Sequence, residues 1–418
     1  MKKAENDNVL KLVAKSEFTL PDKPAGEKAR SFLRDFLRGF FTGEDDEKKV
    51  DVQAELRFAP PSLLDWVAPY PDWSQFSAGV IESLQPWLET EVSDDFFRII
   101  VAPPGSGLKE ILAIIAEKKG WPIVAAPDYA QLAGRDYSWI DKLPRSNEVP
   151  LVIPGLEAMF LRHFNGLEHL RLLIDKLFHL HQRCVIGCNS WLWEYLDVAM
   201  QFGDSFSEPF FLQSLNAQDL QNFFCGLEAQ KGPNVTIFRQ ADNGSFILPF
   251  EITADGKLDP VLIAEFEARK EDYPSEFLKK LAVESRGIPL IAWSIWRNSL
   301  RMAPQEDVAD AARDAAVADS GKTIWVKPFE KLVMPKMPAV SQQAASFLLQ
   351  FLLLHDGLPP DLIHELLGFE KDQVVSLLHS LKKAGIVVAE RGLWRVSWQG
   401  YPEVRRFLAQ QDYLLDSM

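Results

Sequence analysis

The sequence predicts an α/β fold: a parallel sheet covered by helices, then a helical region, then a small unit of three helices and a hairpin. First, short apolar runs alternate with helical stretches between residues 96 and 189. Second, a glycine-rich turn joins the first of these runs to a helix. Third, residues 386–398 contain two short strand-like runs around a Glu-Arg-Gly turn, which is typical of a β-hairpin.

The apolar runs have the length of strands, and the stretches between them have apolar residues every three to four positions, as helices do. Strands that are apolar along their whole length are buried on both faces, as in a parallel sheet covered by helices. In chain order, the predicted elements are a helix at 77–89, a strand at 96–102, a helix at 108–120, strands at 121–126 and 149–155, a helix at 166–182 and a strand at 183–189.

The second half of the chain is predicted to be mainly helical. Residues 215–229 and 260–301 have helical periodicity, whereas residues 302–325 are rich in Ala and Asp and predict a tether or, alternatively, a solvated helix. The last unit has predicted helices at 341–354, 360–367 and 370–384, the hairpin at 386–398, and a final helix at 402–414. Three helices and a hairpin in this order predict a winged helix.

The chain is long enough for about three domains. An amphipathic helix is expected at residues 29–41 and a charged linker at residues 43–49. The predicted organisation is a charged N-terminal region at 1–60, the α/β core at 61–214, a helical lid at 215–301, a linker at 302–339 and the winged helix at 340–418.

Composition limits the classes of function. The chain has 45 Lys and Arg against 59 Asp and Glu, a formal charge of −14, which argues against a protein that coats nucleic acid or anionic membrane by bulk charge. Its three cysteines (Cys184, Cys188 and Cys225) cannot form a disulfide framework, so we expect reduced, buried thiols. No apolar run approaches the ~18 residues that a membrane span needs, so we expect a cytoplasmic protein.

The glycine-rich turn is a candidate phosphate loop, because it lies between a strand and a helix in IIVAPPGSGLKE (residues 99–110). Glycines let the backbone curl so that its N–H groups and the helix N-terminus point at phosphate oxygens. The candidate nucleotide-binding residues of this loop are Pro104, Gly105, Ser106, Gly107, Leu108 and Lys109. The simpler interpretation is a tight turn.

The loop resembles the GPPGSGKT loop of the AAA+ ATPases, a group taken here to include origin-recognition-type initiators and STAND signalling ATPases. In that alignment Ala102 replaces the first Gly, Leu108 the lysine and Lys109 the threonine. The resemblance implies ATP or ADP as ligand. Since the lysine neutralises the β- and γ-phosphates and the hydroxyl holds Mg²⁺, both are weakened here, and Mg²⁺ is not expected. A one-residue slip brings Lys109 back toward phosphate but puts Glu110 in the place of the hydroxyl.

A second motif of the same family is also altered. AAA+ proteins end the third core strand with an Asp that binds Mg²⁺ and a nearby Glu that activates water, whereas VPLVIPGLEAMF has Pro154 in place of the Asp. Glu157 is the nearest carboxylate, in the position where STAND-type sequences often read DGLE. The alternative interpretation of Glu157 is a solvated carboxylate at a helix start.

Two further landmarks follow in order. Asn189 ends a strand and resembles the sensor-1 residue that reads the γ-phosphate, although a helix N-cap explains it as well. The motif SRGIP (285–289) resembles a lid motif of the family and makes Arg286 a nucleotide-binding candidate, with Leu290 in the place of the sensor-2 arginine. No residue is assigned to catalysis or to a metal.

Two other clusters predict packing rather than chemistry. Four histidines (163, 169, 179 and 181) lie within 20 residues but have no Cys or carboxylate to complete a ligand set. The tryptophans at 191, 193, 293 and 296 have helical spacing, which favours core or interdomain packing.

The winged helix supplies candidate partner or DNA contacts at Lys383, Arg391 and Arg395. Residues 341–418 contain seven Lys and Arg and nine Asp and Glu, a net charge of −2. This balance disfavours phosphate neutralisation, so a protein partner is favoured over DNA.

The loss of two metal-and-phosphate motifs on a retained scaffold favours a degenerate, non-hydrolysing AAA+/STAND-like protein, a pseudo-ATPase. It would act as a regulator or adaptor, with weak or no nucleotide binding. The alternatives are a slow or partner-activated ATPase that uses Lys109 and Glu157, and an initiator-like DNA-binding protein.

Overall fold

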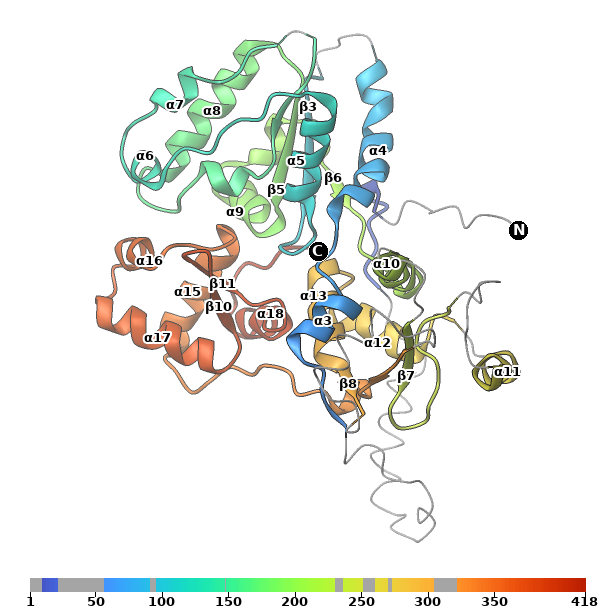
Figure 1. Ribbon diagram of the computed structural model, residues 1–418. Coiled ribbons are helices and arrows are strands. Elements are labelled where there is room, and N and C mark those ends of the chain that lie inside the picture. The colour runs from blue at the N-terminus through green and yellow to red at the C-terminus, as the bar shows by residue number, and fades with distance from the viewer. Residues whose placement is uncertain are drawn as a thin grey trace.

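A computed structural model describes residues 10–21, 56–90, 95–146, 148–229, 236–250, 260–269, 273–303 and 322–418. The helix predicted at 29–41 and the linker predicted at 43–49 lie outside these residues, as does most of the predicted tether. Figure 1 shows three regions: an α/β core, a lid region and a winged helix.

A five-stranded sheet forms the centre of the α/β core. Its strand order is β1-β6-β3-β5-β4, in which β6, β3, β5 and β4 are parallel and β1 is antiparallel at the edge. The strands are β1 (Leu12–Ala14), β3 (Phe97–Ala102), β4 (Leu151–Ile153), β5 (Cys184–Asn189) and β6 (Phe210–Leu212). The parallel strands confirm the fold class predicted from the apolar runs.

Alternate residues of the central strands pack on opposite sides of the sheet. Ile100 and Val185 join the hydrophobic cluster that contains α4 and α5, whereas Ile99 and Ile186 join the cluster that contains α8 and α9. The helices of the core are α3 (Pro61–Val67), α4 (Ser77–Glu89), α5 (Leu108–Lys119), α6 (Tyr129–Ala133), α7 (Ser138–Asp141), α8 (Gly166–Leu180) and α9 (Ser190–Met200), with short 3₁₀ turns η1 (Trp73–Gln75), η2 (Leu156–Met159) and η3 (Phe202–Ser205).

The strand predicted at 121–126 is reduced to a single bridge, in which Ile123 pairs in parallel with Val152 beside β4. Pro122 and Pro127 flank this segment. Because proline has no N–H to donate to a ladder, a regular strand cannot extend through either position.

The lid region contains the predicted helices but also a sheet that was not predicted. Its helices are α10 (Ala217–Ala229), α11 (Pro260–Arg269), α12 (Glu276–Glu284) and α13 (Pro289–Ser299). The four-stranded sheet has the order β2-β8-β9-β7, formed by β2 (Arg57–Phe58), β7 (Thr236–Gln240), β8 (Leu300–Met302) and β9 (Lys322–Val326). The predicted tether at 302–325 is therefore wrong at its end, because residues 322–325 lie in β9. The N-terminal region contributes β1 and β2 to sheets, which was not predicted.

The winged helix follows the predicted order of elements. It contains α15 (Gln342–Leu354), α16 (Pro360–Leu367), α17 (Lys371–Lys383), β10 (Val387–Glu390), β11 (Leu393–Val396) and α18 (Tyr401–Gln410), preceded by η4 (Phe329–Lys331). The hairpin turn lies at Arg391 and Gly392, both with positive φ. In Figure 1 this unit, in orange and red, lies beside α9 of the core and α13 of the lid.

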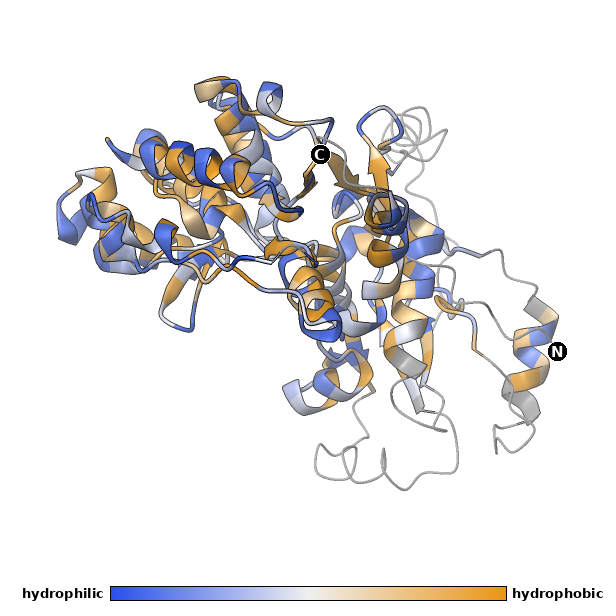
Figure 2. Cartoon of the chain, turned by 90° about the horizontal axis from the view of Figure 1, so that it is seen from above, coloured by the Kyte–Doolittle hydropathy of each residue, from blue (hydrophilic) through white to orange (hydrophobic). Residues whose placement is uncertain are grey.

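Most helices have one hydrophobic and one hydrophilic side, which Figure 2 shows as alternating colours along the ribbons. In α8, for example, Leu170, Leu173 and Leu177 are buried on the sheet side. The structure contains no helix, within the described ranges, that is long and apolar enough to cross a membrane.

Candidate functional site around the phosphate loop

The predicted phosphate loop is a tight turn followed by a helix. Ser106 donates its backbone N–H to the Pro103 carbonyl at 3.1 Å, and Gly105 has φ +85°, as the third residue of a type II turn requires. Gly107 (φ +81°) is the N-cap of α5, and the Ser106 hydroxyl accepts from the Leu108 N–H at 3.3 Å. The segment is therefore a tight turn, and it also joins a strand to a helix as a phosphate loop would.

Two tryptophans pack on the glycines of the loop. A Cβ atom added to Gly107 would lie 2.3 Å from the Trp73 ring, and one added to Gly105 would lie 3.1 Å from the Trp398 ring. Trp73 precedes α4 in the core, whereas Trp398 follows β11 of the winged helix. The loop is thus covered from two sides by side chains of the same chain.

The lid also contacts the loop. The backbone N–H of Leu290, in the first turn of α13, donates to the Gly105 carbonyl at 3.0 Å. Leu290 is the residue that replaces the sensor-2 arginine in the family alignment. Its side chain offers no charge to a phosphate, and its backbone instead fixes the loop.

Arg286, the other lid candidate, is directed away from the loop. Its Nε donates to the Met418 carbonyl oxygen at 2.9 Å, and it is absent from the residues that line the cavity at the loop. Burial lowers the pKa of this guanidinium from its ordinary value. The structure therefore does not bring Arg286 together with the other nucleotide-binding candidates.

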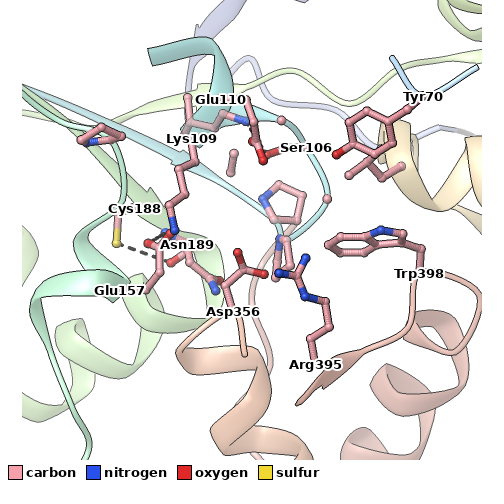
Figure 3. A pocket seen from close by; sticks show the side chains of 18 residues that line it. Tyr70, Ser106, Lys109, Glu110, Glu157, Cys188, Asn189, Asp356, Arg395 and Trp398 are labelled. Carbon is pink, nitrogen blue, oxygen red and sulfur yellow. Dashed lines mark hydrogen bonds between the residues drawn. The ribbon is translucent and has the colours of Figure 1, made fainter. Parts of the chain in front are cut away.

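A small cavity of about 60 Å³ lies between the loop, the strand ends and the winged helix (Figure 3). Pockets for small-molecule ligands usually measure roughly 300–1,000 Å³, so this one has the volume of about two water molecules. The lining residues are Tyr70, Ala102, Pro103, Pro104, Gly105, Ser106, Gly107, Leu108, Lys109, Glu110, Pro154, Glu157, Cys188, Asn189, Leu290, Asp356, Arg395 and Trp398.

Glu157 lies at the carboxyl ends of the parallel strands, in the first turn of η2. Only 7% of its surface is exposed, so the prediction of a solvated carboxylate is wrong. Its Oε2 accepts from the Asn189 N–H at 3.2 Å. Burial raises the pKa of Glu157 to about 7, against the opposing effect of the Lys109 charge.

The Lys109 side chain points toward Glu157 and Asn189 (Figure 3), and the residue is exposed to solvent. Its charge also lowers the pKa of Asp356, whose pKa burial raises overall. Lys109 therefore reaches the strand ends, as the shifted alignment of the loop requires.

Asn189 connects the core to the winged helix. Its Oδ1 accepts from the Trp191 N–H at 2.9 Å, which makes it the N-cap of α9 and confirms that alternative prediction. Its Nδ2 donates to the Leu353 carbonyl, near the end of α15, at 2.6 Å. Both polar atoms of the amide are thus used by the protein itself.

The winged helix contributes three side chains to the cavity: Asp356, Arg395 and Trp398. Asp356 follows α15 and has φ +51°, a conformation that aspartate tolerates better than most residues. Figure 3 shows its carboxylate between Lys109 and Arg395. Sequence reasoning did not select Asp356 or Trp398, because their place at the loop depends on how the winged helix docks.

The three predicted contact residues of the winged helix have different surroundings. Arg395 lines the cavity at the phosphate loop, and Arg391 lies close enough to Tyr70 for its charge to lower the pKa of that phenol, which burial raises overall. Lys383 is exposed in the last turn of α17.

Further contacts hold the winged helix against the core. Arg162 donates its backbone N–H to His355 Nε2 at 3.3 Å and its side chain to Gln350 at 2.8 Å. His355 stacks on Phe160 with ring centroids 5.4 Å apart. Burial lowers the pKa of His355 to about 3, so the ring is neutral at pH 7.

The remaining predicted groups are structural. Cys184 and Cys188 are buried and Cys225 is half-buried, and burial raises the pKa of the Cys184 thiol to about 12. Trp191, Trp193 and Trp296 are buried, which confirms the packing interpretation for these three. Over the described ranges, no three His, Cys, Asp or Glu residues are grouped so that they could hold a metal ion.

Comparison with known proteins shows distant similarity to solved structures. No protein-family model and no curated protein matches the sequence. Among solved structures, a variant of Thermotoga maritima RuvB is similar with a TM-score of 0.32 at 15% identity, over 80% of this chain and 94% of that chain. Aeropyrum pernix ORC2, in its ADPNP–ADP complexes, has a TM-score of 0.29 at 11% identity, over 97% and 98%. Aeropyrum pernix ORC1, in complex with DNA, has a TM-score of 0.28 at 13% identity, over 84% and 96%.

Proposed function

We propose that this chain is a regulatory or adaptor protein built on an ATPase-like fold. In it, the winged helix lies where a nucleotide phosphate would approach the candidate phosphate loop. Trp398 carries the proposal, because its ring packs on Gly105 where a phosphate would approach the loop backbone. The proposal includes weak or no nucleotide binding and a protein as partner.

Three features of the site support this role. Leu108 places an apolar side chain where the loop lysine is expected, and Pro154 removes the metal-binding carboxylate. The cavity of about 60 Å³ is smaller than ligand pockets usually are. The Asp356 carboxyl group lies in the same cavity, where it competes with a phosphate for the positive charges of Lys109 and Arg395.

Calorimetric titration of the full chain with ATP and ADP, each with and without Mg²⁺, tests the proposal. We expect no binding tighter than about millimolar, and no ATP turnover. The Trp398→Ala variant is the matched comparison, since it uncovers Gly105 without changing the loop. Steady ATP turnover by the wild-type chain that a Gly105→Asp change abolishes contradicts the proposal.

A slow ATPase is the second candidate, and one observation favours it: the Lys109 side chain reaches toward Glu157 at the strand ends (Figure 3). In that mechanism Lys109 neutralises phosphate and Glu157 orients water. It predicts that ATP with Mg²⁺ raises the melting temperature and that Lys109→Met removes this shift, whereas Lys119→Met, at the other end of α5, does not.

The position of Arg395 at the cavity supports a protein partner over DNA. A winged helix that binds DNA by its third helix and its wing needs both on one accessible face, and here the wing contributes Arg395 to the interface with the core. Fluorescence anisotropy with duplex DNA at low salt tests this part of the proposal. Tight binding that weakens in Lys383→Ala contradicts it.

A further inference from the structure

The segment that follows α18, residues 411–418, folds back into the junction between the core, the lid and the winged helix. Two of its side chains are almost fully buried: Asp416 is 3% exposed and Met418 is 2% exposed. Met418 belongs to the hydrophobic cluster that contains α8 and α9 of the core. We call residues 411–418 the latch segment.

Asp416 joins the winged helix to the core. It forms an ion pair with Arg405 of α18, and Arg405 also donates to the Asp416 carbonyl at 2.7 Å. On the other side, the Ser190 hydroxyl donates to the Asp416 carboxylate at 2.5 Å. Ser190 is the first residue of α9, so the carboxylate also lies at the positive end of that helix.

The last two residues of the segment reach the lid and a second position of α9. Arg286, between α12 and α13, donates from two guanidinium nitrogens to the Met418 carbonyl oxygen. The Ser417 N–H donates to Glu194 of α9 at 3.3 Å. Residues 416–418 therefore contact all three regions of the molecule within three consecutive positions.

These contacts lie next to residues that join α9 of the core to the winged helix. Asn189, which donates to Leu353 of the winged helix, directly precedes Ser190. Trp191 donates its indole N–H to Tyr401 at the start of α18 at 3.0 Å, one turn before Arg405. We therefore expect a loss of the Asp416 contacts to weaken the interface between α9 and the winged helix.

We propose that the latch segment holds the winged helix over the phosphate loop through the buried Asp416–Arg405 pair and the Ser190 hydrogen bond. When the latch is released, the winged helix separates from the loop while the core stays folded. The latch is thus a control point for exposing the loop and the core face that the winged helix covers.

Hydrogen exchange on the full chain tests the latch. The Asp416→Asn change leaves the buried Arg405 charge without its carboxylate. Removing one partner of a buried ion pair strongly destabilises the structure around it. We expect amide exchange to rise at least about tenfold at residues 105–107 and 353–358, and to stay unchanged in β3 and β5. Asp412→Asn is the matched control, because it removes the same charge from an exposed position of the same segment.

A milder variant separates release of the latch from general unfolding. Ser190→Ala removes only the hydrogen bond to Asp416, and we expect a smaller rise at the same amides. Equal exchange in Asp416→Asn and Asp412→Asn overturns the latch, and so does a uniform rise that includes β3 and β5 in both Asp416→Asn and Ser190→Ala. Nucleotide binding much tighter than millimolar by the wild-type chain contradicts the proposed function, but it does not change the outcome of this exchange experiment.

Discussion

The indole ring of Trp398 packs on the backbone of Gly105, so that a residue just after the β10–β11 hairpin covers the tip of the candidate phosphate loop. The two residues are almost 300 positions apart in the sequence. Gly105 has φ +85° and no side chain, and these two properties would also serve a bound phosphate. Here the space above the glycine is filled by the protein itself, which couples the position of the winged helix to the shape of the loop.

Gly105→Ala should destabilise the chain more than the same change at a glycine with free space. A Cβ atom at Gly105 meets the Trp398 ring and a left-handed backbone, costs that we expect to total about 2–4 kcal/mol. Gly392→Ala is the control, because φ is +82° there and no atom lies within 4 Å of the added Cβ. Urea unfolding measures both variants, and equal losses would show that the Trp398 contact contributes nothing.

Asn189→Ala should lower the free energy of unfolding by more than the loss of a helix cap alone would. The change removes the cap of α9, worth about 1 kcal/mol, and also leaves the buried Leu353 carbonyl without its donor, worth about 1–3 kcal/mol more. Asn189→Ser separates the two, since serine keeps a capping oxygen but is too short to reach Leu353. Thermal unfolding of both variants checks the order: Ala should be less stable than Ser, and Ser less stable than the wild-type chain.

The core and the winged helix could be predicted from the sequence because their signals are local. The apolar run at 97–102, the glycine turn after it and the stripe of Val374, Leu378 and Leu381 on α17 each specify their element within a few residues. Val374, Leu378 and Leu381 recur every three to four positions and are buried on one face of α17, and Leu377 beside them is half-buried. For most elements of the core and the winged helix, the predicted boundaries lie within one or two residues of those in the structure.

The second sheet and the docking of the winged helix could not be predicted in the same way. β2 has only two residues, and its partner β8 lies more than 240 positions later, so no local pattern indicates their pairing. Glu157 likewise lines a cavity that Asp356, Arg395 and Trp398 of the winged helix also line, and these residues come about 200 positions or more later in the sequence. The interpretation of Glu157 as solvated was wrong because it considered η2 alone.

His355 should make stability fall in mild acid. Its pKa in the folded chain is about 3, against an ordinary value near 6.5, so the unfolded chain takes up the proton first as the pH falls below 6.5. Between pH 7 and pH 5 this linkage costs about 2 kcal/mol of unfolding free energy. His355→Gln keeps an acceptor for the Arg162 N–H and should lose this pH dependence. His379→Gln, at an exposed position of α17, should keep it; the same slope in both variants would contradict the assignment.

Glu157 should give a pH dependence of opposite sign. Its pKa is raised from 4.5 to about 7 in the folded chain, so the folded state holds the proton more tightly and stability falls as the pH rises from 4.5 to 7. Above pH 7 the full penalty is about 3 kcal/mol. Because the effects of His355 and Glu157 oppose each other between pH 4.5 and 6.5, the wild-type chain should show a shallow profile there.

Glu157→Gln removes this penalty, because the amide is neutral at every pH and can still accept from the Asn189 N–H. We expect the variant to match the wild-type chain near pH 4.5 and to exceed its stability by up to about 3 kcal/mol at pH 8. Urea unfolding across this range measures the difference. Glu148→Gln is the control, since that carboxylate is exposed and should give a constant, small difference. A variant less stable than the wild-type chain at pH 8 would mean that the Glu157 charge is stabilised by Lys109 more than it is penalised by burial.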